Sequence, residues 1–207
     1  MSTSAAKRTT YHHGNLRAAL LEAARALVLE SGLAGFGLRE VSRRAGVSHA
    51  AAYNHFANRS ALVTALVVEA FGALAEALAA AERLEATPFA RLRTIGVAYV
   101  RFAFEHPAEF KFMFRPELCA DPLAPSEPVA GASRESYSPL ERAIAACLAD
   151  GSLTGDAETL ALTAWAAVHG LASLVVDGPL RNDGLDLAAV DALARGVTAS
   201  LFSAAAR

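Results

Sequence analysis

The side chains best suited to recognising another molecule through hydrogen bonds lie close together in residues 38–62, LREVSRRAGVSHAAAYNHFANRSAL. His49 and Asn54 offer donors and acceptors of the kind that contact base edges in DNA. Ala50 and Ala51 carry so little side chain that a helix surface containing them can approach the bases closely. Three further side chains can donate hydrogen bonds to phosphate oxygens: Tyr53, His55 and Arg59.

The pattern around these residues predicts the two helices that position them. A short helix is expected to end at Ala45, and Gly46 can adopt the left-handed backbone conformation that turns the chain. Val47 is expected to be buried, and the hydroxyl of Ser48 can cap a second helix of about eight residues. Such a helix-turn-helix places its second helix in the major groove of DNA.

The charge distribution supports a polyanion-binding first third of the chain. Residues 1–60 contain eight Lys or Arg and three Asp or Glu, a net charge of +5, whereas the remainder has eleven and eighteen, a net charge of −7. A basic segment attached to an acidic body is typical of a nucleic-acid-binding head on a body with another role.

Catalysis is the competing class of function, and the sequence offers little for it. It has no GxSxG elbow, phosphate loop or HExxH pair. His49 and His55 are six residues apart, which would turn them to different helix faces, and Cys119 and Cys147 form no CxxC pair. We therefore expect no metal, no cofactor and no enzymatic activity.

The segment 45–62 resembles the recognition-helix motif of the tetracycline-repressor (TetR) family of bacterial transcriptional regulators. The family pattern is Ala-Gly-Val-Ser, four variable positions, Tyr-x-His-Phe, a basic residue and a Leu. Every element is present, as Ala45-Gly46-Val47-Ser48, Tyr53, His55, Phe56, Arg59 and Leu62, and the resemblance covers about residues 10–65. It implies that seven residues face DNA: Arg39, Ser48, His49, Ala51, Tyr53, His55 and Arg59.

Two positions depart from the family pattern. Gly37 stands where many members have a Thr that caps the first helix of the motif and contacts phosphate, which weakens one expected contact. Ser42 replaces a usual Ala on the packed face, where we expect it to add a local hydrogen bond.

Helical spacing continues through the rest of the chain, and no strand is predicted. The fold class is therefore all-α. Five of the eight prolines lie between Pro116 and Pro139, a stretch that we expect to be mostly irregular, with Tyr137 in or beside the loop. The remaining helices are expected at residues 16–31, 58–84, 88–106, 107–114, 140–148, 157–176 and 187–202.

One helix tests whether the protein is soluble. Residues 159–176 form a run of eighteen uncharged positions, near the length that spans a bilayer. Small and polar residues interrupt the run and acids rather than bases bound it, so we expect a helix buried inside protein. No apolar stretch follows the basic residues near the N-terminus, so no secretory signal is predicted and the expected location is the cytoplasm.

Aromatic residues in the second part of the chain indicate either a solid core or a pocket for a mostly apolar effector. Trp165-x-x-x-His169-Gly170 resembles a motif found in one subgroup of the family's ligand-binding domains, and so does His106-Pro107 followed by an aromatic-rich helix. The candidate ligand-binding residues are Tyr99, Phe102, Phe110, Met113, Phe114, Trp165 and His169.

The last two predicted helices carry apolar residues alternately three and four positions apart, the spacing of a seam between helices. Both seams could form a four-helix bundle between two copies of the chain, or they could face the core of their own domain. The candidate interface residues are Ala161, Ala164, Val168, Gly170, Ala172, Leu187, Val190, Ala194, Val197 and Leu201.

The expected organisation is a DNA-binding domain at residues 1–60 and an effector-binding and dimerisation domain at residues 61–207. The resemblance implies a homodimeric, ligand-responsive regulator, most often a repressor, that binds a palindromic operator in double-stranded DNA and is released by a small-molecule effector. The alternative is a dimeric, helical small-molecule-binding protein that does not bind DNA.

Overall fold

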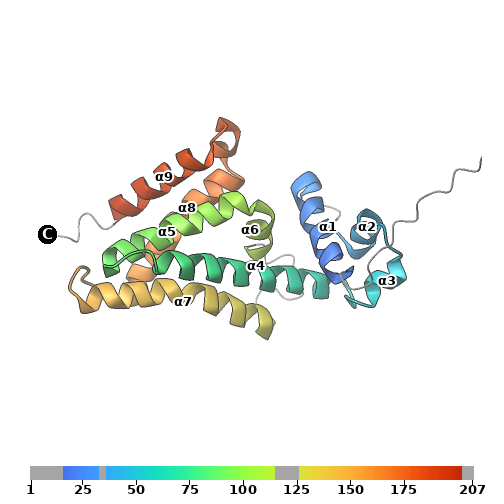
Figure 1. The fold of residues 1–207 in the computed structure, drawn as a ribbon, viewed down its shortest axis with the longest axis horizontal. Helices are drawn as coiled ribbons and strands as arrows, with labels where there is room; N and C mark the ends of the chain where they lie inside the picture. The colour runs from blue at the N-terminus through green and yellow to red at the C-terminus, as the bar shows by residue number, and fades with distance from the viewer. Residues whose placement is uncertain (1–15, 33–35, 115–125, 202–207) are drawn as a thin grey trace, which may run out of the picture. The chain divides into compact units, whose positions relative to one another are not determined.

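The computed structural model describes residues 16–32, 36–114 and 126–201 (Figure 1). Within these residues the chain is entirely helical and contains no strand. It divides into two compact units, Met1–Leu62 and Val63–Arg207. The helices are α1 (Leu16–Ser31), α2 (Leu38–Arg44), α3 (His49–Tyr53), α4 (Arg59–Glu82), α5 (Pro88–Glu105), α6 (Pro107–Met113), α7 (Glu127–Ala149), α8 (Ala157–Val176), the 3-10 helix η2 (Pro179–Asp183) and α9 (Leu187–Leu201).

The first unit packs α1, α2 and α3 against one another. Apolar residues at helical spacing on α1, including Leu20 and Val28, meet Val41 of α2 and Ala52 of α3, and all four are almost completely buried. Gly32 ends α1 with φ of +66°, which confirms the predicted left-handed stop.

The second unit is built around α5, which packs against α6, α7, α8 and α9. Gly96 of α5 lies against α9 so closely that an added Cβ would stand 2.7 Å from Cγ2 of Thr198 and 3.2 Å from Cγ1 of Val168. The absence of a side chain at this position therefore allows the close approach of α5 and α9. Helix α4 begins in the first unit and continues into the second.

Side-chain caps fix several helix starts. Asn58 Oδ1 accepts a hydrogen bond from the Ala61 amide at 2.8 Å and so caps α4, as predicted. Thr87 and Asp156 cap α5 and α8 in the same manner, and Pro88 occupies the first turn of α5, where no amide donor is needed.

The prediction of an irregular stretch up to Pro139 is wrong for residues 127–139, which form the first half of α7. Pro128 lies in the first turn, where its missing N–H has no partner to lose. Pro139 lies inside the helix and cannot bond the carbonyl of Glu135. The Ser138 hydroxyl donates to that carbonyl at 2.9 Å instead. Residues 115–125, which include the rest of the predicted loop and Cys119, lie outside the described residues.

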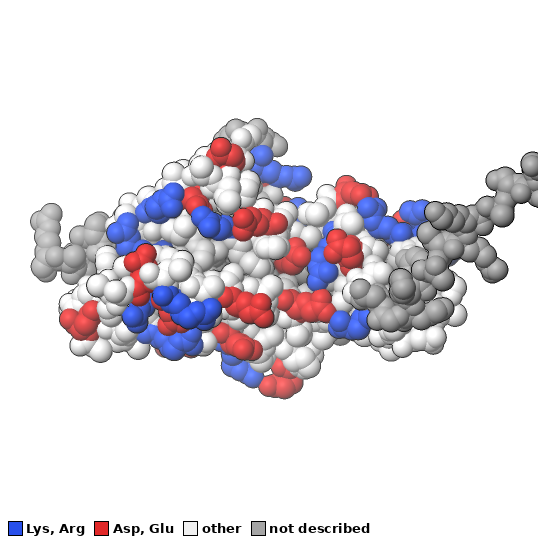
Figure 2. Space-filling view, viewed as in Figure 1, with Lys and Arg blue, Asp and Glu red and all other residues white. Residues whose placement is uncertain are grey.

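Two helices, α4 and α8, are long and apolar enough to cross a membrane by length and composition alone. Core helices of soluble proteins have the same length and composition. Helix α8 packs against α5, α7 and α9, and the face that the sequence predicted to be buried contains Ala161, Val168 and Ala172. Figure 2 shows basic and acidic side chains interspersed over the viewed surface.

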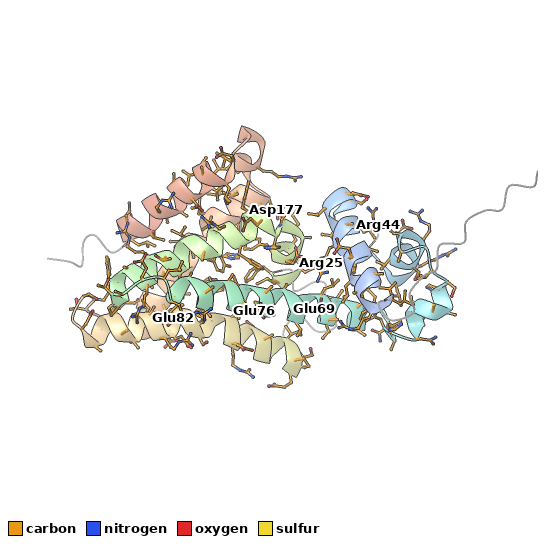
Figure 3. The ribbon with its side chains drawn as sticks, viewed as in Figure 1. Arg25, Arg44, Glu69, Glu76, Glu82 and Asp177 are labelled. Atoms are coloured by element: carbon orange, nitrogen blue, oxygen red, sulfur yellow. The ribbon has the colours of Figure 1, made fainter. Side chains whose placement is uncertain are left out.

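Ion pairs join the helices of the second unit. Arg142 of α7 donates through Nη2 to Oε2 of Glu82 on α4 at 2.7 Å, and Lys111 of α6 pairs with Asp177 at 2.9 Å (Figure 3). Arg101 of α5 forms a forked pair with the nearly buried carboxylate of Asp191 on α9. The fork holds the two helices in register near the Gly96 contact.

Candidate nucleic-acid interface and ligand cavity

The helix-turn-helix is formed by α2, the turn at Gly46 and α3. Gly46 has φ of +68°, and the Val47 amide donates to the carbonyl of Ser42 at 3.0 Å, which closes the turn. Ser48 Oγ accepts from the Ala51 amide at 3.1 Å, which confirms the predicted cap of α3. Helix α3 comprises five residues rather than about eight, so Asn54 and His55 lie in the turn that follows it.

Of the two departures from the family pattern, Ser42 forms the expected local hydrogen bond, while the weaker phosphate contact expected at Gly37 stays a prediction. Gly37 precedes the first residue of α2 and supplies no side-chain hydrogen bond to it. Ser42 is buried, and its hydroxyl donates to the carbonyl of Leu38 at 2.6 Å, one turn earlier in the same helix. Both substitutions are thus accommodated without disturbing the helix-turn-helix.

Most of the predicted DNA-facing side chains are exposed to solvent. The rings of His49 and Tyr53 meet edge to face with centroids 4.7 Å apart, so they share one face of α3. Ala51 is half-buried, while the others are exposed: Arg39, Ser48, His49, Ala50, Tyr53, Asn54 and His55. The structure thus brings together a histidine, a phenol and an amide with free access to solvent.

Arg59 has a structural role that the sequence did not suggest. Its Nε donates to the carbonyl of Phe36 at 3.1 Å, and its guanidinium lies 5.5 Å from the centre of the Phe36 ring. The side chain is half-buried at the start of α4. Only the terminal nitrogens of Arg59 are therefore left for a phosphate contact.

Acidic residues compensate part of the positive charge of the first unit. Arg43 pairs with Glu40 within α2, and Arg44 of α2 pairs with Glu30 of α1 through two hydrogen bonds. Hydrogen bonds from Arg44 hold the pKa of Glu30 below its usual value, so this carboxylate stays ionised. At least two of the eight Lys and Arg residues in this segment are therefore already paired with carboxylates, a compensation that the net charge of +5 includes.

A cavity of about 450 Å³ lies within the second unit. Helices α4, α5, α7, α8 and α9 supply its walls, together with Phe114 after α6. Its lining is mostly apolar and includes five aromatic residues: Phe71, Tyr99, Phe114, Tyr137 and Trp165. Three charged residues also line it: Arg93, Arg134 and Glu141. The size and the apolar walls are those of sites that enclose a small organic ligand.

The seven candidate ligand-binding residues separate into two groups. Tyr99, Phe114 and Trp165 line the cavity. Phe110 and Met113 are buried in the core, Phe102 borders a separate groove, and His169 lies behind the lining. These four residues do not line the cavity: Phe102 of α5 and Phe110 and Met113 of α6 are buried, and His169 of α8 is half-buried.

His169 acts on the cavity through Tyr99. The Tyr99 hydroxyl and His169 Nδ1 are 2.9 Å apart and form a hydrogen bond. Burial lowers the pKa of His169, which favours the neutral imidazole, and raises the pKa of Tyr99, which keeps its phenol protonated. Which of the two groups donates depends on whether Nδ1 or Nε2 of His169 carries the imidazole proton.

The cavity residues that the sequence analysis missed come mainly from α4 and α7. Phe71 and Leu74 of α4 were not among the candidate residues, Tyr137 of α7 was placed in or beside a loop, and Glu141 fell in the predicted helix 140–148 without a role. Arg93 of α5 was not considered. The only available signal was the periodicity of residues 127–149, which the two prolines conceal.

Comparison with known families decides the identity of this fold. Residues 20–66 match the sequence model described as bacterial regulatory proteins of the tetR family, and residues 92–201 match that of the tetracyclin repressor-like C-terminal domain. The chain belongs to the TetR family. It is therefore a transcriptional regulator with a DNA-binding helix-turn-helix and a ligand-binding C-terminal domain, in a family of regulators rather than enzymes.

Solved structures agree with this assignment. A protein of unknown function from Rhodococcus sp. RHA1 is 34% identical, with 97% of this chain and 100% of that one covered and a TM-score of 0.78. A tetR-family regulatory protein from Rhodococcus RHA1 is 20% identical over 90% and 96%, with a TM-score of 0.75. The regulator FadR from Bacillus subtilis, in complex with stearoyl-CoA, is 15% identical over 90% and 97%, with a TM-score of 0.72. No curated protein matches the chain.

The predicted interface residues of this TetR-family regulator mostly serve its own core. Six of the ten are buried within the single chain, which corrects their assignment to a subunit interface: Ala161, Ala164, Val168, Ala172, Val190 and Ala194. The other four, Gly170, Leu187, Val197 and Leu201, are exposed or half-buried. The seams pack α8 and α9 against α5, as the alternative interpretation proposed.

The opposite faces of α8 and α9 remain uncovered. Leu162 and Leu174 of α8 and Leu193 of α9 are 56%, 44% and 39% exposed, which is unusual for leucine. Leu193 also lines a shallow groove, formed mainly by α9, whose other lining side chains are almost all small or aliphatic, Val197 and Leu201 among them. We call the three leucines and this groove the α8–α9 outer face.

Proposed function

We propose that this TetR-family protein is a homodimeric, ligand-responsive regulator, most simply a repressor, that binds a palindromic operator in the cytoplasm. Residues 1–60 bind DNA, and residues 61–207 bind the effector and the second subunit. The observation that carries the proposal is the exposure of His49 and Tyr53, on a capped helix that follows a tight turn, and of Asn54 and His55 in the turn after that helix.

On this surface, His49 and Asn54 contact base edges while Tyr53, His55 and Arg39 bind phosphates. Ser48, Ala50 and Ala51 allow the start of α3 to approach the groove. One recognition helix of five residues reaches few base pairs, so two copies related by a two-fold axis are needed to read a palindrome.

The effector links the two domains through α4. Phe71, Leu74 and Leu78 of this helix line the cavity, and the same helix begins at Arg59 beside the helix-turn-helix. A ligand that favours one position of α4 over another changes the fraction of protein competent to bind the operator. Tyr99, Phe114 and Trp165 contact the apolar body of the ligand. We assign the chain to the subgroup with the Trp165-x-x-x-His169-Gly170 motif, because both motif side chains contribute to the cavity wall or its support.

The dimer forms through the α8–α9 outer face. Exposed leucines on two neighbouring helices are typical of a subunit interface, and an open apolar groove favours a self-complementary contact. Leu193→Arg introduces a charge into this contact and is expected to give a folded monomer in sedimentation. Leu84→Arg, at a leucine that is 77% exposed elsewhere, serves as the matched control and should remain dimeric. A dimeric Leu193→Arg variant would place the interface on another surface.

Operator binding is tested by selecting duplexes from random DNA with the full-length protein. The expected result is a palindromic consensus, bound with lower affinity by a His49→Ala variant. The alternative function, ligand binding without DNA binding, predicts no enriched sequence and no retention of duplex DNA at low salt. Recovery of an asymmetric site bound by one subunit would contradict the homodimeric proposal.

A further inference from the structure

The charged residues of the cavity differ in how they are compensated. Arg134 is exposed and donates through Nη2 to Oε1 of Glu127 at 2.8 Å. Arg93 is half-buried, and among the residues that the structure describes it has neither an ion pair nor a hydrogen bond. Glu141 is exposed at the edge of the cavity, where water solvates it. Arg93 is therefore the charge that lacks both a protein partner and full hydration.

A guanidinium in this position favours an anionic partner. Its planar fork of N–H donors matches the two oxygens of a carboxylate, and charge-assisted hydrogen bonds are strongest where water is partly excluded. Desolvation already weakens the interaction of Arg93 with solvent, so a ligand anion replaces less hydration there than at an exposed arginine. The apolar walls formed by Leu74, Leu78 and Ile95 suit an aliphatic or aromatic body beside that anion.

A cationic ligand is less well matched to the same cavity. Aromatic faces attract cations, but the aromatic rings here already meet one another edge to face. Phe71 and Phe114 have ring planes at 80° with centroids 6.0 Å apart, and Tyr137 and Trp165 have planes at 85° with centroids 6.1 Å apart. In such pairs one ring edge already covers a face of the other. Arg93 would also repel a cation.

We propose that the effector is an amphipathic carboxylic acid, with an apolar aliphatic or arylaliphatic body in the cavity and a carboxylate paired with Arg93. This inference rests on the proposed function of the cavity as the effector site and specifies the ligand class. Arg93 also borders the groove formed by α4, α5 and α9. The carboxylate consequently lies at the edge of the cavity, with the apolar body extending inward toward Trp165.

The experiment uses Trp165, the single tryptophan of the sequence, as its probe. Because Trp165 lines the cavity, a bound ligand alters its fluorescence without any DNA in the assay. Decanoate, 4-phenylbutyrate, decanol, decylamine and decanoyl-CoA are titrated against the full-length protein. We expect the two acids to bind, and decanoate to bind at least about tenfold more tightly than decanol, since a hydrogen-bonded charge pair distinguishes them.

Variants of the charged residues assign the contact. Arg93→Gln is expected to weaken decanoate binding about 10- to 100-fold and to leave decanol binding within about twofold. Arg93→Lys, which keeps the charge and loses the fork, is expected to give an intermediate affinity. Arg142→Gln is the matched control, because Arg142 does not line the cavity and its guanidinium is already paired with Glu82, and this variant should bind decanoate as the unchanged protein does. Thermal unfolding without ligand verifies that each variant is folded.

Four results would overturn the inference. The first is equal affinity for decanoate and decanol, and the second is tighter binding of decylamine than of decanoate, lost in Glu141→Gln. The third is binding of decanoyl-CoA without binding of decanoate, and the fourth is no change in Trp165 fluorescence with either acid. None of these measurements depends on operator binding. Failure of the DNA-binding proposal therefore leaves the ligand assignment intact, and failure of the ligand assignment leaves the DNA-binding proposal intact.

Discussion

The two units of the molecule differ in where their candidate binding side chains lie: on an exposed surface in the first unit and around a cavity in the second. The first unit exposes His49, Tyr53 and Asn54 on a helix held by a local turn and a local cap. The second unit encloses a cavity whose walls come from helices distant in the sequence, with Arg93 half-buried at its lining. An exposed surface of this kind suits a large polyanion, and an enclosed apolar volume suits a small ligand. Substitutions on the exposed surface of the first unit should alter DNA binding without altering stability. Substitutions inside the cavity of the second unit should alter both ligand binding and stability.

The largest expected contrast between the two sites is their response to salt. We expect the logarithm of operator affinity to fall with the logarithm of salt concentration with a slope of about −5 to −9, if each dimer displaces counterions from six to ten phosphates, on the order of the contacts made by such proteins. A rise from 50 to 200 mM then lowers the affinity about 10³- to 10⁵-fold. Binding of one carboxylate in the cavity should change less than about threefold. Fluorescence anisotropy of a labelled duplex measures operator affinity, and Trp165 emission measures carboxylate affinity. Similar salt slopes for the two affinities would contradict the expected contrast between the two sites.

The second contrast lies within the exposed surface itself. His49→Ala should lower affinity by about 1–3 kcal/mol at particular operator positions, because a base contact is lost. Tyr53→Phe should weaken all duplexes alike, because a phosphate contact carries no sequence information. Both side chains are exposed, so the free energy of unfolding should change by less than about 0.5 kcal/mol. An unchanged operator consensus for His49→Ala would contradict its role in reading bases.

The third contrast tests close packing in the second unit. Gly96→Ala places a Cβ 2.7 Å from Thr198 Cγ2, and Thr198 cannot rotate freely because it is β-branched and its hydroxyl donates to the Ala194 carbonyl. We expect a loss of about 1–3 kcal/mol in the free energy of unfolding. Gly72→Ala on α4 is the control, because no atom lies within 4 Å of its added Cβ, and it should gain up to about 1 kcal/mol. Thermal unfolding measures both; equal effects would show that α5 and α9 adjust to the methyl group.

The smallest expected effect is the pH dependence contributed by His169. Its pKa is below the ordinary value of 6.5 in the folded protein because burial disfavours the imidazolium. The unfolded chain therefore binds a proton first as the pH falls below 6.5, and the folded state loses stability from there down to the lowered pKa. Above 6.5 both states are neutral and the contribution is constant. The melting temperature of His169→Gln should depend less on pH between pH 5 and 7 than that of the unchanged protein. An identical pH profile would show that His169 does not contribute to the pH dependence.

The first unit could be predicted from sequence because each of its boundaries has a local cause. Gly32 and Gly46 require the left-handed backbone, and Ser48 and Asn58 cap the helices that follow them. Such signals act over four residues or fewer and need no knowledge of the rest of the fold. The packing of Arg59 on Phe36 was not predictable, since it joins residues that are 23 positions apart in the sequence.

The cavity and the packing of α8 and α9 were predicted less well because they depend on long-range contacts. Periodicity identified the apolar faces of α8 and α9, but it could not tell whether each face packs inside its own subunit or against a second subunit. In the structure, residues of these faces such as Val168 and Val190 are buried within the single chain. Phe114 and Phe110 are four residues apart, yet the first lines the cavity and the second does not. The first half of α7 was missed because Pro139 is tolerated through the Ser138 hydroxyl, a side-chain compensation that a rule about proline does not include.

Pro139 divides α7, which forms one wall of the cavity, into two halves that differ in local stability. Before Pro139 only Val129 and Ser136 are buried, whereas Ala143, Ile144 and Cys147 are buried after it. The junction between the halves also lacks one backbone hydrogen bond, so the first half can unwind without pulling the second half from the core. Amide hydrogens of the first half should accordingly exchange with solvent far faster than those of the second. Local opening of this half exposes Tyr137 and the cavity behind it, which gives a ligand a route of entry that requires no global unfolding.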